Sequence, residues 1–398
     1  MSVWDEVVGQ PAAVQTLSAA ARGAAEVVAG TPSGTAVSSS AMTHSWLFTG
    51  PPGSGRSVAA RAFAAALQCS QGGCGACPQC HQVRAGTHAD VRLVVPEGLS
   101  IPVKQMRELV LRAAQSPSGG RWHVILIEDA DRLTEGASNA LLTAIEEPPA
   151  RSVFLLCAPS THPDDVAVTV RSRCRVISLR TPTADAIAAL LVTRDGVDEA
   201  MARWAARASQ GHVGRARRLA RDEEARSRRQ TVLSLPRSLT GLGACFDAAE
   251  ILIQAVEDEA AAVTQPIDGS ETEALKQALG AGGTGKGAAG ATRGSAGQLK
   301  DLEKSQKSRR TRAQRDALDR ALVDLAAFYR DVLAARLGAR VPSVHADIPD
   351  VVGRAAQVWT PESVLRRLDS VLACRAAIEL NVKPRIAVEA MAIALREG

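Results

Sequence analysis

Residues Gly50–Ser57 read GPPGSGRS, and this short stretch decides the fold that the sequence predicts. Its spacing matches the phosphate-binding pattern G-x-x-x-x-G-K-[ST], except that Arg56 stands at the lysine position. The apolar stretch SWLFTG precedes the loop, and the helical pattern SVAARAFAAAL follows it. In such a unit the glycines let backbone N–H groups approach phosphates at the positive end of the helix. The candidate nucleotide-binding residues are therefore Gly50, Gly53, Gly55, Arg56 and Ser57, with the Ser57 hydroxyl as a candidate Mg²⁺ ligand.

Two carboxylates at the end of a second apolar run would complete a nucleotide site. The run is HVILIEDA, and its polar end carries Glu128 followed by Asp129. A hydrolysing site of this kind usually has an aspartate for the metal and then a glutamate for the attacking water, so the order is inverted here. Arg56 keeps the positive charge but is longer and forked, where lysine is a compact point charge. Because reacting groups must be closely positioned, we expect ATP and Mg²⁺ binding, and intrinsic ATPase activity, to be weakened or lost.

Apolar runs and helical patterns alternate in the first half of the chain. The stretches SWLFTG, HVILIEDA and SVFLLCAP are nearly continuous apolar runs, which is typical of parallel strands covered on both faces. After Arg180 only helical patterns rich in Ala, Arg and Leu follow. The sequence therefore predicts a parallel α/β domain followed by an all-helical part.

A glycine-rich segment interrupts the helical part. Gly280–Gln298 contains eight glycines in nineteen residues. Such a segment has too little apolar surface to bury for a stable folded structure. We expect a flexible insertion there, over about residues 265–310.

Four of the eight cysteines, Cys69, Cys74, Cys77 and Cys80, lie within twelve residues in the spacing C-x4-C-x2-C-x2-C. Four thiolates at such spacings suit tetrahedral Zn²⁺, and a closed four-ligand site is structural. An iron–sulfur cluster is the alternative, although the usual ferredoxin spacings differ. The adjacent His81 is a weaker candidate ligand.

Charge and hydropathy narrow the possible functions. No run of eighteen apolar residues occurs, and the N-terminus MSVWDEVVGQ lacks an apolar segment, so we expect a cytoplasmic protein without a membrane span. The positive charge is concentrated in two stretches. The net charge is only +5, but Arg203–Arg229 holds nine arginines against three acids, and Lys300–Arg320 is again basic. Such stretches either bind a phosphate backbone or form solvated helix faces, and composition leaves both interpretations open. Aromatic residues make up 3% of the chain, which argues against stacking platforms for single strands.

Five segments together resemble a known family: VVGQ (Val7–Gln10), the GPPGSGRS loop, the four-cysteine module, SNALLTAIEEPP (Ser138–Pro149) and VRSRC (Val170–Cys174). With this combination the chain is similar to the bacterial clamp-loader AAA+ subunits of DNA polymerase III over residues 1 to about 220. The resemblance implies an AAA+ P-loop-type α/β domain at 1–178 with an inserted zinc module at 69–80. It also implies a helical lid at 179–225 and an all-α collar at 226–398 that joins other subunits in a hetero-oligomeric ring.

Within that family the chain resembles the delta-prime type more than the ATP-hydrolysing gamma/tau type. Arg56 replaces the lysine, the carboxylates are inverted, and Gly214 stands where the motor type carries a sensor arginine, with Arg215 beside it. The resemblance implies a stator within the DNA polymerase III holoenzyme that helps load the sliding clamp onto primed DNA. Its direct partners would be the gamma/tau and delta subunits. A gamma/tau-like motor is the alternative.

Arg173 matches one catalytic residue of the family. The resemblance implies that this arginine of the Ser-Arg-Cys triplet reaches into the ATP site of a neighbouring subunit; the alternative is a pairing with a surface carboxylate.

A zinc-dependent DNA-binding module is a further alternative for the cysteine segment. CSQGGCGACPQCHQVR argues against it, because this segment is nearly neutral and contains no aromatic residue.

Overall fold

The computed structural model describes residues 2–30, 41–96, 98–113, 115, 117–119, 121–279 and 288–398, with backbone alone at 288–296. The chain divides into two compact units, Met1–Arg217 and Arg218–Gly398. None of the described helices is both long enough and apolar enough to cross a membrane.

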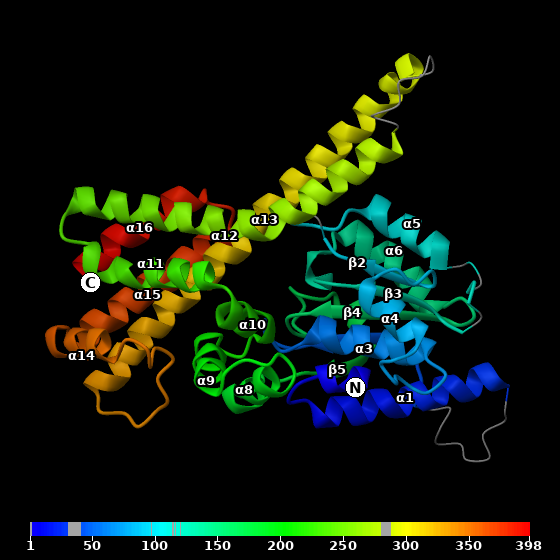
Figure 1. Cartoon of the computed structure of the whole chain (residues 1–398), viewed down its shortest axis with the longest axis horizontal. Coiled ribbons are helices and arrows are strands. Elements are labelled where there is room, and N and C mark those ends of the chain that lie inside the picture. The colour runs from blue at the N-terminus through cyan, green and yellow to red at the C-terminus, as the bar shows by residue number, and fades with distance from the viewer. Residues whose placement is uncertain are drawn as a thin grey trace. The chain divides into compact units, whose positions relative to one another are not determined.

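The first unit is built on a five-stranded parallel sheet in the order β2-β3-β4-β1-β5 (Figure 1). Its strands are β1 (Ser45–Thr49), β2 (Val91–Val94), β3 (His123–Ile127), β4 (Ser152–Ala158) and β5 (Arg175–Ser178). The three predicted strands are confirmed as β1, β3 and β4, which occupy the centre of the sheet. The two edge strands β2 and β5 were not predicted, because VRLV and RVIS are short and expose polar side chains, as edge strands commonly do.

Helices cover both faces of this sheet. Trp46 and Phe48 of β1 pack in one apolar cluster with α1 and α3, whereas Leu47 packs in the other cluster with α5 and α6. This alternation follows from the pleat, which turns successive side chains to opposite faces. The helical segments of the unit are η1 (Val3–Glu6), α1 (Pro11–Ala29), α3 (Arg56–Gln68), α4 (Pro78–Ala85), α5 (Val103–Ala113), η2 (Ala130–Arg132), α6 (Glu135–Glu146), α7 (Val168–Arg171), α8 (Ala184–Thr193), α9 (Glu199–Ala208) and α10 (Val213–Arg221), whose end extends into the second unit.

The second unit is all helical over its described residues. Its elements are α11 (Glu223–Ser238), α12 (Leu242–Ala278), α13 (Ala288–Arg336), α14 (Pro349–Val358), α15 (Pro361–Glu379) and α16 (Pro384–Glu397). One apolar core joins them, with the aromatic rings of Phe328 and Tyr329 fully buried. A parallel α/β sheet followed by a mostly helical C-terminal part is therefore confirmed. The finer division into domains at 1–178, 179–225 and 226–398 stays a prediction.

The predicted boundaries of the flexible insertion need correction. Residues 280–287 lie outside the described residues, but residues 265–278 belong to α12 and residues 297–310 belong to α13. The two helices form a hairpin that extends beyond the other helices of the unit (Figure 1). Polar contacts hold it: Gln306 Nε2 donates to the Asp268 carbonyl at 3.0 Å, and Arg309 binds the Asp268 carboxylate at 2.9 Å. The glycine content predicted too long an insertion, because the residues that flank the glycines form helices and bind one another across the hairpin.

A buried charge cluster ties α11 to the second unit. The Arg229 side chain is 3% exposed; its Nη1 lies 3.1 Å from Asp347 Oδ2 and its Nε lies 3.9 Å from Asp324 Oδ2. We expect Arg229→Ala to lower the free energy of unfolding by about 3–5 kcal/mol, because removing one member of a buried ion pair leaves buried charge uncompensated. Urea unfolding of the full chain measures this, with the exposed Arg203→Ala as the control that should change by less than about 1 kcal/mol. A loss for Arg229→Ala as small as the control's would contradict the expectation.

Candidate functional site

The GPPGSGRS loop has the geometry of a phosphate-binding loop. It connects β1 to α3, and the Ser54 N–H donates to the Pro51 carbonyl at 3.0 Å to form its turn. Gly53 and Gly55 have φ values of +86° and +90°, which side-chain-bearing residues rarely adopt. Gly55 is the N-cap of α3, so Arg56 and Ser57 lie in the first helical turn. The loop therefore lies between a strand and a helix N-terminus as its sequence predicts, and nucleotide binding by it stays a prediction.

Gln10 braces this loop from a distant part of the chain. Its buried amide Nε2 donates to the Ser54 carbonyl at 3.3 Å and also to the Arg180 carbonyl. In return, the Arg180 N–H donates to Gln10 Oε1 at 3.2 Å. The loop is therefore tied to the chain that leaves β5. Sequence reasoning used VVGQ only as a family marker and missed this role.

The segment Ser209–Ala216 lies directly against the loop. A Cβ atom placed on Gly53 would lie 2.7 Å from His212 Cα, so only glycine fits there. His212 itself caps α10, since the Arg215 N–H donates to its Nδ1 at 3.2 Å. Gly214, at the predicted sensor position, lies beside the His212 ring, with its ideal Cβ position 3.3 Å from Cε1. His212 therefore packs on the loop, and Gly214 lies behind it; the sensor position stays a prediction.

One carboxylate at the end of β3 binds an arginine of α3. Glu128 Oε1 lies 2.7 Å from Arg61 Nη2, one helical turn beyond Arg56. Asp131 is a further acid of this group, which sequence reasoning missed; burial and the Asp129 charge raise its pKa, against a lowering effect of Arg56. The Arg56 Nη1 atom is buried and has no hydrogen-bond partner among the described residues. The structure thus brings Arg56, Glu128 and Asp129 to one end of the sheet.

The four predicted cysteine ligands converge. The sulfur atoms of Cys69, Cys74, Cys77 and Cys80 all lie within 4.8 Å of one another, which fits a tetrahedral thiolate site. Although burial raises the pKa of the Cys69 thiol, N–H donors of Cys74, Gly73 and Gln71 outweigh it and lower the pKa to about 6. Four convergent sulfur atoms, one of them with a lowered pKa, are suited to bind Zn²⁺. His81 does not join this group of donors among the described residues.

The cysteine module also holds the N-terminus of the chain. The Val3 N–H donates to the Gly73 carbonyl at 3.0 Å, and Trp4 Nε1 donates to the Gly72 carbonyl at 3.1 Å. Glu6 binds Arg84 at the end of α4. The module therefore fixes η1 against α3 and α4.

Arg173 lies at the surface between α7 and β5. Its Nη2 is 2.6 Å from Glu146 Oε1, and the two side chains are 39% and 46% exposed. Its Nη1 donates to the Thr169 carbonyl at 2.9 Å. The pairing with a surface carboxylate is therefore present, but an ion pair this exposed contributes little and is easily exchanged. The guanidinium is held at the surface, where a neighbouring molecule can reach it.

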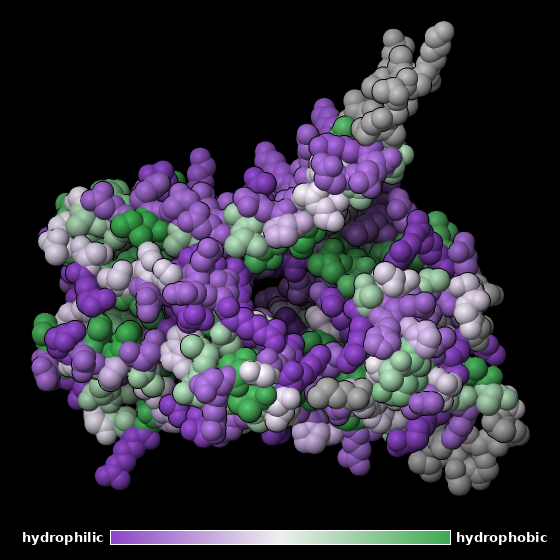
Figure 2. All heavy atoms as spheres, viewed as in Figure 1, coloured by the Kyte–Doolittle hydropathy of each residue, from purple (hydrophilic) through white to green (hydrophobic). Residues whose placement is uncertain are grey.

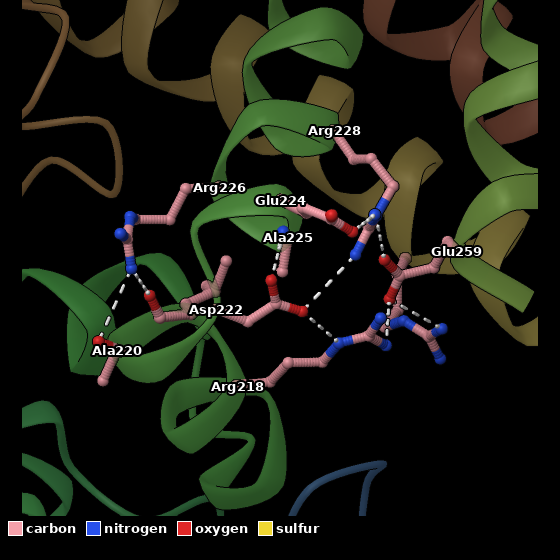
Figure 3. Close-up of polar contacts among 10 residues, drawn as sticks. Arg218, Ala220, Asp222, Glu224, Ala225, Arg226, Arg228 and Glu259 are labelled. Atoms are coloured by element: carbon pink, nitrogen blue, oxygen red, sulfur yellow. Dashed lines mark hydrogen bonds and ion pairs between the residues drawn. The ribbon is translucent and has the colours of Figure 1, made fainter. Parts of the chain in front are cut away.

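The Arg203–Arg229 stretch is largely neutralised by acids of the fold. Figure 3 shows Arg218 and Arg228 converging on Glu259 and Asp222. Arg218 Nη1 lies 2.7 Å from Glu259 Oε1, and Arg228 Nε lies 3.1 Å from Glu259 Oε2. Asp222 also caps α11 by accepting from the Ala225 N–H at 3.1 Å. These arginines therefore hold α10, α11 and α12 together.

Further arginines of this stretch have acidic partners as well, namely Arg203 with Glu199, Arg217 with Asp195, and Arg229 with Asp347. Arg226 instead donates to the Leu219 carbonyl at 3.0 Å. Because so many of its cations bind carboxylates, this stretch favours the interpretation as structural helix faces over that of a phosphate-binding surface.

Comparisons with known proteins agree with these features. Residues 34–183 match the family described as DNA polymerase III, delta subunit. The chain is 37% identical over 137 residues to DNA polymerase III subunit delta' of Pseudomonas aeruginosa, covering 33% of this chain and 41% of the relative. It is 31% identical over 197 residues to the delta' subunit of Bacillus subtilis, covering 49% and 59%.

Tau subunits are similar as well. The tau subunit of Bacillus subtilis is 31% identical over 150 residues, covering 37% of this chain and 26% of the relative. The matched part thus spans between about a quarter and three fifths of these relatives' own lengths.

Proposed function

We propose that this chain, whose residues 34–183 belong to the clamp-loader AAA+ family of DNA polymerase III, is a stator subunit of the delta-prime type. In this role it joins gamma/tau-like and delta-like subunits in a cytoplasmic ring and helps to load the sliding clamp onto primed DNA. Its own nucleotide site is degenerate, and its Zn²⁺ is structural.

One observation carries the stator role. The phosphate-binding loop keeps its backbone geometry, yet Arg56 stands at the lysine position and the Glu128 carboxylate is bound by Arg61 at 2.7 Å. A lysine can present a compact charge to the β- and γ-phosphates, whereas the forked guanidinium cannot replace it geometrically. The close packing of His212 on Gly53 also supports the stator role, because it leaves the loop little space to move at this glycine. The chain therefore has the shape of the nucleotide site without its chemistry.

Reconstitution tests this function. The full chain, mixed with the motor and delta-type subunits of the same organism, should enter one ring in gel filtration, and clamp loading onto primed DNA should require it. Complete loading in its absence would overturn the proposal. A gamma/tau-like motor is the second candidate, favoured by the similarity to the tau subunit.

A nucleotide titration separates the two candidates. We expect calorimetry with ATP and Mg²⁺ to detect no binding to the chain up to millimolar ATP, since Arg56, Glu128 and Asp129 all depart from a working site. Arg56→Lys alone should restore little hydrolysis. The matched variant that combines Arg56→Lys with Glu128→Asp and Asp129→Glu should restore more, because it returns both carboxylates to their usual order. Micromolar binding with turnover by the unaltered chain would instead support the motor.

A further inference from the structure

We propose that the α12–α13 hairpin carries a surface that binds the phosphate backbone of duplex DNA, formed by Lys300, Lys304 and Lys307. We call the hairpin residues 268–279 and 297–312 the arm. Its described surface is mostly hydrophilic in the view of Figure 2. The choice of DNA as the ligand rests on the proposed function. That the surface is basic and exposed follows from the contacts of the arm.

The carboxylates on the α12 side of the arm are neutralised within it. Arg309 binds both Asp268 and Glu271 at 2.9 Å, and Lys276 binds Glu273 at 2.9 Å. Arg310 also lies 4.0 Å from Asp268, so three cations balance the three carboxylates on this side. The positive charge of the arm is therefore concentrated on α13.

The three lysines are exposed and lack acidic partners. The side-chain ammonium groups of Lys300, Lys304 and Lys307 make no ion pair or hydrogen bond to any residue that the structure describes. Their spacing of four and three residues places them on one face of α13, over about 10 Å of helix axis. In having no acidic partners these lysines differ from the arginines of the Arg203–Arg229 stretch, many of which bind carboxylates that the fold supplies.

Two acids of α13, Asp301 and Glu303, moderate the local charge. Three of the six basic residues in 300–312 are paired with acids: Arg309 and Arg310 lie against Asp268, and Arg312 lies 3.7 Å from Asp316. The three lysines remain, against Asp301 and Glu303. Glu303 precedes Lys307 by four residues, a spacing whose attraction is weak in water, so a phosphate can compete with it. The surface is thus an exposed basic stripe and not a saturated ion-pair network.

The chemistry of the stripe fits a phosphate backbone, and the charge density of that backbone favours a duplex. Residues 265–315 contain no aromatic side chain, which excludes stacking of single-stranded bases on the arm. A duplex presents one phosphate per about 1.7 Å of its axis, so a stripe of about 10 Å always faces several phosphates. Lysine contacts of this kind bind without regard to sequence.

Fluorescence anisotropy with a labelled 30-base-pair duplex tests the proposal on the full chain. The slope of log Kobs against log salt falls by about 0.9 for each phosphate contact that is lost. Replacing Lys300, Lys304 and Lys307 by glutamine should therefore reduce the magnitude of the slope by about 2–3. The matched control replaces Arg354, Lys383 and Arg396, three exposed cations elsewhere in the second unit, by glutamine; it should change the slope by less than about 1.

Equal changes in the two variants, or an unchanged slope for the lysine variant, would overturn the proposal. So would an absence of duplex binding by the unaltered chain at 50 mM salt. Circular dichroism confirms that both variants keep their helices. Ring assembly is measured separately, so a chain that enters the ring but fails this test retains its proposed function and loses only the DNA surface.

Discussion

Cys77→Ser is expected to abolish zinc binding and to unfold the module at 69–80. The unaltered chain should contain about one zinc per molecule by elemental analysis, because four sulfur atoms lie within 4.8 Å of one another. Structural zinc sites contribute on the order of 10–16 kcal/mol of binding free energy, so losing one of four ligands is a large perturbation. The loss should spread to η1, whose Val3 and Trp4 donate to carbonyls of the module. Amide hydrogen exchange of residues 2–7 should therefore accelerate together with that of the module.

The control for this experiment is Cys174→Ser, which removes a cysteine outside the cluster. It should leave the zinc content and the exchange of residues 2–7 unchanged. A chelator should reproduce the effect of Cys77→Ser on the unaltered chain. Iron in place of zinc would identify the alternative cluster, and a chain without metal whose module exchanges slowly would contradict a metal-dependent module.

Local patterns predicted the first unit well. The strand–loop–helix unit around GPPGSGRS depends on neighbouring residues, and the four cysteines lie within twelve residues, so their positions could be inferred from spacing. The central strands were found because burial on both faces makes them continuously apolar. Edge strands escape such reasoning, since one side of each faces solvent and its sequence is mixed.

What could not be predicted depends on residues far apart in the chain. Gln10 meets Arg180 across 170 positions, and Arg229 meets Asp347 across 118. The composition of Arg203–Arg229 indicates a basic stretch. Whether its arginines can bind an external ligand depends on acids such as Glu259, which lies in another helix. The same limit applied to residues 265–310, where pairing across the hairpin orders the segments that flank the glycines.

The second large effect is expected in a neighbouring subunit. Arg173→Ala should leave the ring assembled, because the pair with Glu146 is exposed on both sides and such pairs contribute about 0–1 kcal/mol. If Arg173 is donated in trans, the ATP site that receives it loses a cation beside the γ-phosphoryl group. An arginine finger accelerates phosphoryl transfer by on the order of 10³–10⁵. Turnover at that one site should fall by a similar factor, and clamp loading should fall with it.

Arg173 can serve at most the ATP site of the subunit that it touches, so the measurement must resolve a single site. Total DNA-stimulated ATPase activity should drop by the share of a single site, while single-turnover measurements should resolve one slow site among normal ones. Arg203→Ala removes a more exposed arginine, 63% against 39% for Arg173, that pairs with Glu199 on its own helix, and it should leave every site at full rate. Glu146→Gln adds a sharper comparison, because it frees Arg173 without removing it and should therefore preserve turnover. If Arg173→Ala and Arg203→Ala behave alike in an intact ring, Arg173 acts only as the surface partner of Glu146.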